Sequence, residues 1–303
     1  MKTQGMKQNN RLINALFLAP SLTAFILVVI IPFFMGLYFS LTDWNGAIQN
    51  KITFVGLKNF SIIFSDVKFH YSFLVTTIYT AANVIVINLV ALILALLVTS
   101  NIKFRNFYRS GFFTPNLIGG IVLGYVWQFI FVNAIPGFAT IAGIESLTSS
   151  LLGKGPTALA AIVVVGSWQY AGYIMMIYVA AIQNVPISLL EAAQIDGANF
   201  LQRTKAILVP LVAPAFTVST FLTLVNSFKQ FDVNVSLTNG GPSGQFSGKV
   251  VKATEFLALN IYNTAFTRNR MAEGQAKAVV FFLVLVIVSL VQVYFNKKKE
   301  VEM

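Results

Sequence analysis

The residues best placed to do chemistry lie in one short polar segment, EAAQIDGANFLQRTKAILVP at residues 191–210, between two apolar runs. Glu191 and Asp196 carry carboxylates, and Arg203 carries a guanidinium group. Such groups form strong, charge-assisted hydrogen bonds with an oppositely charged or polar partner. The sequence does not surround them with other catalytic residue types, so we interpret their chemistry as recognition rather than catalysis.

The spacing of the same segment predicts two short helices. Ser188, followed three residues later by Glu191, predicts a capping box at the start of the first helix. Gly197 suits the left-handed position that ends a helix, and residues 199–206 can form the second helix. Helices this short are unstable unless they dock against something. From the residues alone, a well-capped connecting loop and a partner-docking element are equally good interpretations.

Several reaction classes are excluded by residues that the chain lacks. There is no cysteine and a single histidine, His70, so thiolate and multi-histidine metal sites are not expected. LLGKGPT at 151–157 resembles a phosphate-binding loop, but Lys154 is followed by glycine and not by Ser or Thr. We therefore predict that the chain is not an enzyme, has no catalytic residue and binds neither a metal nor a cofactor itself.

Composition indicates a membrane protein with several spans. Of 303 residues, 56% are hydrophobic and only 10% are charged, well below the share typical of soluble domains. Runs of about 20 apolar residues can cross the hydrocarbon core. We predict an all-α, polytopic membrane protein with six transmembrane helices in a single domain, residues 1–303. The predicted spans are 12–41, 72–100, 112–134, 157–182, 207–228 and 278–295.

None of these six spans contains Asp, Glu, Lys or Arg. Proton-coupled carriers usually place carboxylates or histidines in the membrane, and voltage sensors place arginines there. Both classes are therefore disfavoured, as is an intramembrane hydrolase, which needs a base to activate its nucleophile. If the chain belongs to an energised transporter, a partner must hydrolyse the nucleotide.

Basic residues predict the orientation of the spans. They are denser in the tails and short loops on one side, which places both termini in the cytoplasm of a cell-membrane protein. These residues are Lys2, Lys7, Arg11, Lys103, Arg105, Arg109, Arg203, Lys205, Lys297, Lys298 and Lys299. The net charge of +11 thus fits membrane topology, and we do not expect nucleic acid as a partner. The segment 188–206 then faces the cytoplasm.

The three outer segments, residues 42–71, 135–156 and 229–277, contain turn signals. Glycine and proline pairs of this kind punctuate secondary structure. The predicted turns fall at Asn45-Gly46, Gly56, Pro136-Gly137, Gly153 to Pro156, and TNGGPSG from residue 238. TNGGPSG is either a surface turn or a contact for a delivering protein, and the sequence does not separate the two.

Polar residues within the spans fall on helical stripes. On the fifth span, Ser219, Thr223, Asn226 and Gln230 lie on one face. Neutral hydrogen-bonding groups and aromatic rings suit an uncharged sugar, although the same residue types also join neighbouring helices in membranes. The candidate substrate-pathway residues are Thr80, Asn83, Tyr125, Gln128, Gln169, Tyr173, Thr223, Asn226 and Gln230.

The segment after the fourth span resembles a known signature. Glu191-Ala192-Ala193, then Gly197, then Ile207-Leu208-Val209-Pro210 is similar to the cytoplasmic motif of binding-protein-dependent ABC importer permeases, with Val209 where leucine is usual. Four further stretches resemble the carbohydrate-uptake branch of that family, so the resemblance covers most of the chain. They are LAPSLTAFILVVIIPF at 18–33, FVGLKNF at 54–60, SWQYAGYIMMIYVAAIQNVP at 167–186 and LTNGGP at 237–242.

This resemblance implies a type I ABC importer permease fold and a set of partners. The chain would form half of a sugar or oligosaccharide pathway, completed by a second, similar permease, so that a heterodimer is expected. Two ATPase subunits would bind ATP and Mg, and an external binding protein would deliver the substrate. The first helix of segment 188–206 would be the coupling helix, docking on the ATPase through Glu191, Ala192, Ala193, Asp196 and Gly197. A stand-alone carrier or channel for a small polar solute, and a membrane scaffold, are the alternatives.

Overall fold

A computed structural model describes the backbone of residues 2–47 and 52–298, and side chains from residue 14 onward outside that gap. The side chains of Lys2, Lys7 and Arg11, and the whole of Lys299, lie outside the described residues. The chain divides into two compact units. Unit 1 comprises residues 1–65 and 261–280, and unit 2 comprises residues 66–260 and 281–303.

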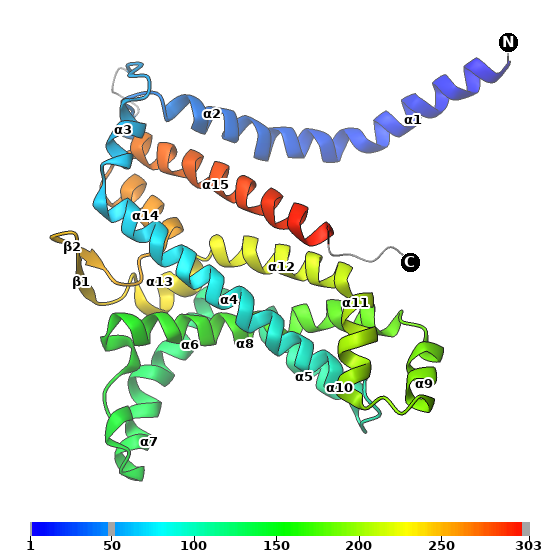
Figure 1. Ribbon diagram of the computed structural model, residues 1–303. Helices are drawn as coiled ribbons and strands as arrows, with labels where there is room; N and C mark the ends of the chain where they lie inside the picture. Colours follow the sequence, from blue (N-terminus) through cyan, green and yellow to red (C-terminus); the bar gives the residue numbers. More distant parts are fainter. Residues whose placement is uncertain (1, 48–51, 299–303) are drawn as a thin grey trace. The chain divides into compact units, whose positions relative to one another are not determined.

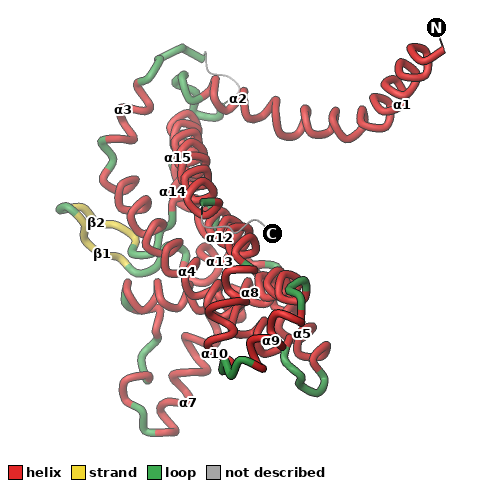
Figure 2. Tube along the Cα trace, turned by 45° about the vertical axis from the view of Figure 1, so that its right-hand side comes forward, coloured by secondary structure: helices red, strands yellow, loops and turns green. Residues whose placement is uncertain are grey.

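Unit 2 is built on three long helices, α4 (Val67–Thr99), α8 (Gly155–Gln183) and α12 (Ala213–Phe228), which pack side by side (Figures 1 and 2). Shorter helices connect and cover them. These are α5 (Arg105–Phe113), α6 (Gly120–Phe129), α7 (Ile135–Ala142), α9 (Ile187–Ile195), α10 (Phe200–Arg203), α11 (Val209–Leu211) and α13 (Asp232–Thr238). The helix α14 (Leu257–Tyr262) and the long α15 (Met271–Lys297) cross the division between the units.

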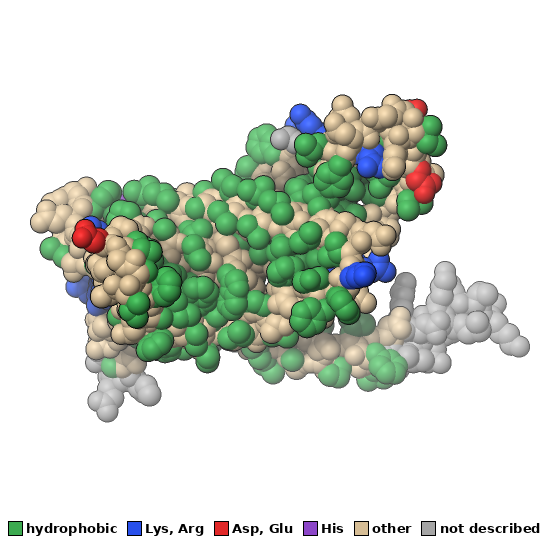
Figure 3. Space-filling view, turned by 90° about the horizontal axis from the view of Figure 1, so that it is seen from below, with side chains coloured by type: hydrophobic (Ala, Val, Ile, Leu, Met, Phe, Trp, Pro, Cys, Tyr) green, Lys and Arg blue, Asp and Glu red, His purple; other side chains and the backbone are tan. Residues whose placement is uncertain are grey.

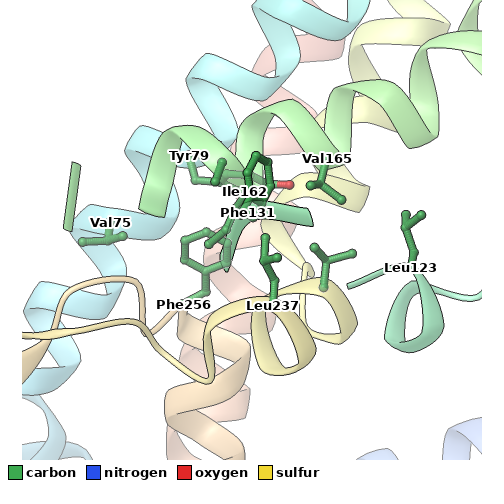
Figure 4. Close-up of a cluster of buried hydrophobic side chains, with 10 residues drawn as sticks. Val75, Tyr79, Leu123, Phe131, Ile162, Val165, Leu237 and Phe256 are labelled. Atoms are coloured by element: carbon green, nitrogen blue, oxygen red, sulfur yellow. The ribbon is translucent and has the colours of Figure 1, made fainter. Parts of the chain in front are cut away.

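Two apolar clusters hold unit 2 together. In the first, Tyr79 from α4 and Ile162 from α8 meet Leu237 from α13 and Phe256 (Figure 4). The ring centroids of Tyr79 and Phe256 lie 4.5 Å apart, a favourable aromatic contact. The second cluster joins the far halves of α4 and α8 to α12. Its buried members are Ile87, Ala91, Ala95, Val98, Ile174, Met175, Tyr178, Val179 and Ala215.

Small residues let the helices of unit 2 approach closely. Gly172 in α8 is buried, and a Cβ atom added there would overlap the carbonyl group of Phe112 in α5. Any side chain at this position would therefore push α5 away from α8. This kind of small-residue contact is common between membrane helices, where close packing and not hydrophobic exclusion drives association.

Unit 1 contains the first apolar helix and the segment that follows it. The helices α1 (Lys2–Phe25) and α2 (Ile31–Phe39) are continuous through a π-helical turn at Ile26–Ile30. After α2 the chain folds back, and the side-chain amide of Asn59 in α3 (Lys58–Phe64) donates to the carbonyls of Ser40 and Thr42 at 2.8 and 2.7 Å. The backbone amide of Ala272 in α15 donates to the Trp44 carbonyl at 2.9 Å.

In three of the described helices, a π-helical turn ends two residues before a proline. The turns are Ile26–Ile30 before Pro32, Ile130–Ala134 before Pro136, and Thr204–Leu208 before Pro210. Proline removes one donor and its ring clashes with the carbonyl four residues back. The wider π turn accommodates it and the helix continues. The predicted turn at Pro136-Gly137 is therefore wrong, because these residues lie inside α7.

The structure has five described helices long and apolar enough to span a membrane, and a bent pair that makes a sixth span if counted as one. The predicted third span, 112–134, starts too early: α5 and a 3-10 turn, Thr114–Leu117, are separated from α6 by extended backbone at Ile118 and Gly119. The span covers Gly120–Ala142 instead. Hydropathy averages over such a break and does not reveal it.

The fifth and sixth spans also differ from the prediction of two plain helices. The helical segment Phe200–Leu211 meets α12 at an angle of 71°, with the bend at Val212. The sixth helix begins at Met271, not 278, and so includes Glu273 and Lys277. Lys277 is buried and donates to the Thr264 hydroxyl at 3.0 Å within unit 1. The absence of charge holds for residues 278–295 but not for the whole helix.

The segment between α12 and α15 contains a turn and a small β-hairpin. Positive φ angles at Asn239, Gly240 and Gly241 confirm the predicted TNGG turn. The two antiparallel strands that follow, β1 (Ser243–Phe246) and β2 (Lys249–Lys252), pair Ser243 with Lys252 and Phe246 with Lys249. The hairpin was not predicted, because its strands are short and lack a long alternating pattern. Glycines at 46 and 56 likewise adopt the positive φ expected of turns.

Candidate functional site

The first helix of the polar segment begins differently from the prediction. Helix α9 starts at Ile187, directly after Pro186, and no side chain caps it. Ser188 lies one residue inside the helix, so the predicted Ser188–Glu191 capping box is wrong. Pro186 explains the difference. It has no amide proton and its φ is fixed, here at −57°, so it takes the N-cap position and the helix begins at the next residue, Ile187. Glu191 is left exposed on the surface of α9.

The end of α9 is formed by Gly197, as predicted. Gly197 has a φ of +83°, and its amide donates to the Gln194 carbonyl at 3.1 Å. The next amide, of Ala198, donates to the Ala193 carbonyl at 2.9 Å. This pair of hydrogen bonds is a Schellman motif, which satisfies the last carbonyls of a helix and reverses the chain. Apart from its two chain neighbours, no described residue has an atom within 4 Å of the position of a Gly197 Cβ, so conformation and not crowding requires glycine there.

Helix α10 carries the capping box that the sequence analysis placed in α9. The Asn199 side chain accepts from the Gln202 amide at 2.9 Å, and the Gln202 side chain accepts from the Asn199 amide at 2.8 Å. The signal was present in the sequence, since Asn at a cap followed three residues later by Gln is a known form of this motif. It was overlooked because the serine and glutamate of α9 fit the same pattern.

We call residues 187–203, from the start of α9 to the end of α10, the α9–α10 element. Its side chains are unusually exposed for apolar residues. Ile195 is 87% exposed and Leu201 is 76% exposed, and Ile187, Leu189 and Phe200 are also exposed. Glu191 and Asp196 stand exposed among them. An exposed apolar group rimmed by charges is characteristic of a surface that binds another protein or a membrane.

The predicted pathway residues divide into two groups by their surroundings in unit 2. Thr80, Asn83, Gln169 and Thr223 are buried, while Gln128 is partly buried. Gln169 donates to the Ile118 carbonyl at 3.0 Å, and Gln128 donates to the Leu237 carbonyl at 3.2 Å. The Thr80 hydroxyl has no hydrogen-bond partner among the described residues.

Asn83 is the centre of one buried network. Its amide donates to the hydroxyls of Tyr79, at 3.2 Å, and Ser227, at 2.8 Å, and its carbonyl accepts from the Ser167 hydroxyl at 3.2 Å. These contacts join α4, α8 and α12 at one point. Neutral side chains that satisfy one another in this way are inexpensive to bury.

A second network lies further along the same three helices. Asn88 donates to the Thr223 hydroxyl at 3.0 Å and accepts from the Tyr178 hydroxyl at 2.7 Å. The Tyr178 and Ser219 hydroxyls are 2.6 Å apart. The sequence does not single out Asn88 and Tyr178, because each is a single polar group on an otherwise apolar turn and neither belongs to a stripe.

The remaining predicted residues are accessible. Tyr125 is 58% exposed, and Asn226 and Gln230 are half-buried. Tyr173 lines a cavity of about 560 Å³ between α5 and α8, together with Arg109, Phe113 and Met176. On the face shown in Figure 3, hydrophobic side chains cover much of the surface and charged side chains are few. No cluster of residues suited to a metal ion occurs among the described residues.

Residues 87–301 match the family model described as the inner membrane component of binding-protein-dependent transport systems. The chain belongs to this family. As predicted from the EAA-type motif, it is a permease subunit of the ABC importer type. The matched region includes the α9–α10 element and the whole of the second hydrogen-bond network, whereas Asn83 and Tyr79 of the first network lie before its start.

Two relatives and one solved structure are similar to this permease over nearly its whole length. The "Probable starch degradation products transport system permease protein" of Thermoanaerobacterium thermosulfurigenes is 47% identical over 95% of both chains. The sn-glycerol-3-phosphate transport system permease of Brucella abortus is 30% identical over 96% of both. A chain of a bacterial ABC transporter that imports the polysaccharide alginate superposes with a TM-score of 0.81 at 17% identity, covering 98% of this chain and 99% of that one. The predicted fold class is confirmed.

Proposed function

We propose that this permease forms half of the pathway of an ATP-driven importer for a sugar or oligosaccharide. An external binding protein would deliver the substrate, a second permease would complete the pathway, and two ATPase subunits holding ATP and Mg would supply the energy. Family membership and 47% identity to a permease named for starch degradation products support this proposal. The single observation that carries it is the exposed α9–α10 element with its EAA-to-Gly197 spacing.

In this proposal, the α9–α10 element docks on the ATPase. The docking residues are Glu191, Ala192, Ala193, Asp196 and Gly197. The exposed isoleucines and leucines supply apolar contact area, and the alanines let the partner approach closely. The exposed carboxylate of Glu191 is free of any role in capping α9, so it can accept a hydrogen bond from a basic group on the ATPase. Docking would also supply the stabilisation that helices of this length need.

The substrate pathway is proposed to run along the faces that carry the predicted polar residues. Tyr125, Tyr173, Asn226 and Gln230 are accessible, and they offer aromatic faces and neutral hydrogen-bonding groups. Sugars present both hydroxyl groups and apolar ring faces, so this combination suits them. The buried residues Thr80, Asn83, Gln128, Gln169 and Thr223 would hold the helices that present these groups.

The orientation that we propose places both termini and the α9–α10 element in the cytoplasm of a cell-membrane protein, and treats residues 1–303 as one permease domain. The higher density of basic residues in the tails and short loops on one side of the membrane supports this orientation. A neutral sugar is preferred to glycerol phosphate as cargo, because the relative named for the phosphate is the more distant of the two.

Reconstitution of the complete transporter tests this function. Proteoliposomes would contain the permease, the sister permease and the ATPase, with the binding protein added outside. We expect uptake of a radiolabelled glucose oligosaccharide that requires both ATP and the binding protein, and no comparable uptake of glycerol phosphate. Uptake without ATP or partners would indicate a stand-alone carrier or channel. An assembled complex that transports nothing would indicate a scaffold.

A further inference from the structure

We propose that Arg203 is the positioning residue that makes the α9–α10 element move as one body with the helical segment leading to α12. This inference rests on the proposed function, because it assigns the route by which docking at α9 reaches the fifth span. It concerns a residue outside the EAA-to-Gly197 motif. The guanidinium group of Arg203 in α10 donates to the side-chain carbonyl of Gln194 in α9 at 2.7 Å.

Helix α9 has few other attachments. It contains no buried residue, and Ile187 and Ile195, near its two ends, are 70% and 87% exposed. The Schellman turn at Gly197 fixes the direction in which the chain leaves α9 but does not fix the angle between α9 and α10. The hydrogen bond from Arg203 to Gln194 spans the two helices away from that turn. It therefore restricts the angle that the turn alone leaves free.

On its other side, Arg203 belongs to a continuous helical segment. The backbone is helical from Phe200 to Leu211, through the π turn, and then bends by 71° into α12 at Val212. Leu208 and Val212 are buried, so the segment is anchored in unit 2 where α9 is not. A displacement of α9 that is passed to Arg203 therefore acts on the bend at the start of α12.

The space beneath the element allows such a displacement. Arg203 lines a cavity of about 250 Å³ with Thr99 at the end of α4, Ile182 at the end of α8, and Leu190 in α9. The Nε atom of Arg203 is buried and has no hydrogen-bond partner among the described residues. Buried donors without partners are uncommon and costly. The Arg203 side chain is thus held by its hydrogen bond to Gln194. It borders the cavity and is not closely packed against other side chains.

The test is the number of sugar molecules imported per ATP hydrolysed by the complete reconstituted transporter. Arg203→Ala and Gln194→Ala each remove the hydrogen bond, and Gln194 is exposed, so its replacement should leave folding intact. For both variants we expect ATPase co-purification and hydrolysis within about twofold of wild type. Uptake per ATP should fall about tenfold, a size consistent with losing one charge-assisted hydrogen bond. The double variant should lose no more than either single one, because both changes break the same contact.

Lys205→Ala is the matched control. It removes one positive charge from the π-helical turn directly after the element, but Lys205 is exposed and its side chain does not line the cavity. Its uptake per ATP should match wild type. The inference is overturned if Gln194→Ala keeps the wild-type ratio, if the effects of the two single variants add, or if ATPase association is lost together with uptake. If wild type itself neither binds the ATPase nor transports with ATP, the proposed function fails instead.

Discussion

The side-chain amide of Asn83 in α4 donates a 2.8 Å hydrogen bond to the hydroxyl of Ser227 in α12, and the two residues are separated by 144 positions in the chain. The carbonyl of the same amide accepts from Ser167 in α8. One side chain therefore ties together the three long helices of unit 2. It does so through neutral groups, which explains how a polar residue is retained in an apolar span.

Replacing Asn83 by alanine should loosen this junction. The hydroxyls of Ser167 and Ser227 would each lose a buried partner, and interhelical hydrogen bonds in membrane proteins contribute about 1 kcal/mol. We expect a lower midpoint of thermal unfolding in detergent. Thr77→Ala is the control, since Thr77 is exposed on the same helix and its hydroxyl donates to the Phe73 carbonyl one turn back in that helix. Equal midpoints for the two variants would contradict the role given to Asn83.

Gly172 should tolerate no side chain. A Cβ atom would overlap the Phe112 carbonyl, and overpacking of this kind costs about 1–3 kcal/mol. Gly172→Ala should therefore lower the yield of folded permease and its unfolding temperature. Gly111→Ala, in the neighbouring helix α5, has open space around the added methyl group and should be neutral or slightly stabilising. The close approach of α5 to α8 would be refuted if both variants behaved alike.

Turns were predictable from the sequence where the backbone needs a conformation that only one or two residue types adopt easily. Gly197 and the TNGG turn needed positive φ, and the sequence supplied residues that accept it. The start of α9 was not predictable in the same way, because Ser188–Glu191 and Asn199–Gln202 both fit a capping box and only the second forms one. A proline directly before the helix decides between them.

The spans illustrate a different limit. Hydropathy located the apolar runs, but it does not distinguish a straight helix from one that breaks at Ile118–Gly119 or bends at Val212. At Pro136 the sequence predicts a turn, but the helix continues through this proline after a π-helical turn. Of the stripe predicted on the fifth span, Ser219 and Thr223 are buried in α12, Asn226 is partly buried, and Gln230 lies beyond the end of the helix. Whether each member points at a neighbouring helix, as Thr223 does, depends on packing that a single sequence does not encode.

The loop after α2 should respond to pH through Asp43. The Asp43 carboxylate accepts from the Thr53 backbone amide at 2.7 Å, and this hydrogen bond, with nearby Lys58, holds its pKa below the usual 3.8. A carboxyl whose pKa is lowered by folding stabilises the folded loop above its unfolded pKa. That contribution is lost as pH falls through the lower, folded pKa.

Hydrogen exchange at the Thr53 amide measures this effect. After correction for intrinsic exchange, protection in wild type should be constant near neutral pH and should fall only below about pH 3.8, the usual pKa of an aspartate. Asp43→Asn keeps an acceptor oxygen but does not titrate, so protection at Thr53 should not change with pH. A similar acid-induced loss in the asparagine variant would rule out Asp43 as the titrating group.

The motif of the α9–α10 element makes a stronger prediction about uptake. Gly197→Val forces a β-branched residue into positive φ, which is a severe conformational strain. Glu191→Arg reverses the exposed charge proposed to meet the ATPase. Both variants should insert into the membrane at wild-type levels, lose ATPase co-purification and abolish uptake, because the element is exposed and contributes little to the core. Gly137→Ala, at a helical glycine with open space around it, should transport normally.

Recovery of the ATPase at wild-type levels with both the Gly197→Val and the Glu191→Arg permeases would contradict the docking role. The result would also separate docking from transmission, since loss of the Arg203–Gln194 contact is expected to spare association. Co-purification should therefore separate the two groups of variants, because it is lost with Gly197→Val and Glu191→Arg but kept with Arg203→Ala and Gln194→Ala.

The location of the α9–α10 element is the most direct test of the account, and the absence of cysteine from the natural sequence makes it simple. Ile195→Cys and Val250→Cys place single thiols at positions that are 87% and 61% exposed, one in α9 and one in the hairpin. With a membrane-impermeant maleimide, we predict that intact cells label Val250→Cys but not Ile195→Cys. Inside-out vesicles should label Ile195→Cys, and bound ATPase should protect it. Labelling of Ile195→Cys from outside intact cells would contradict the account.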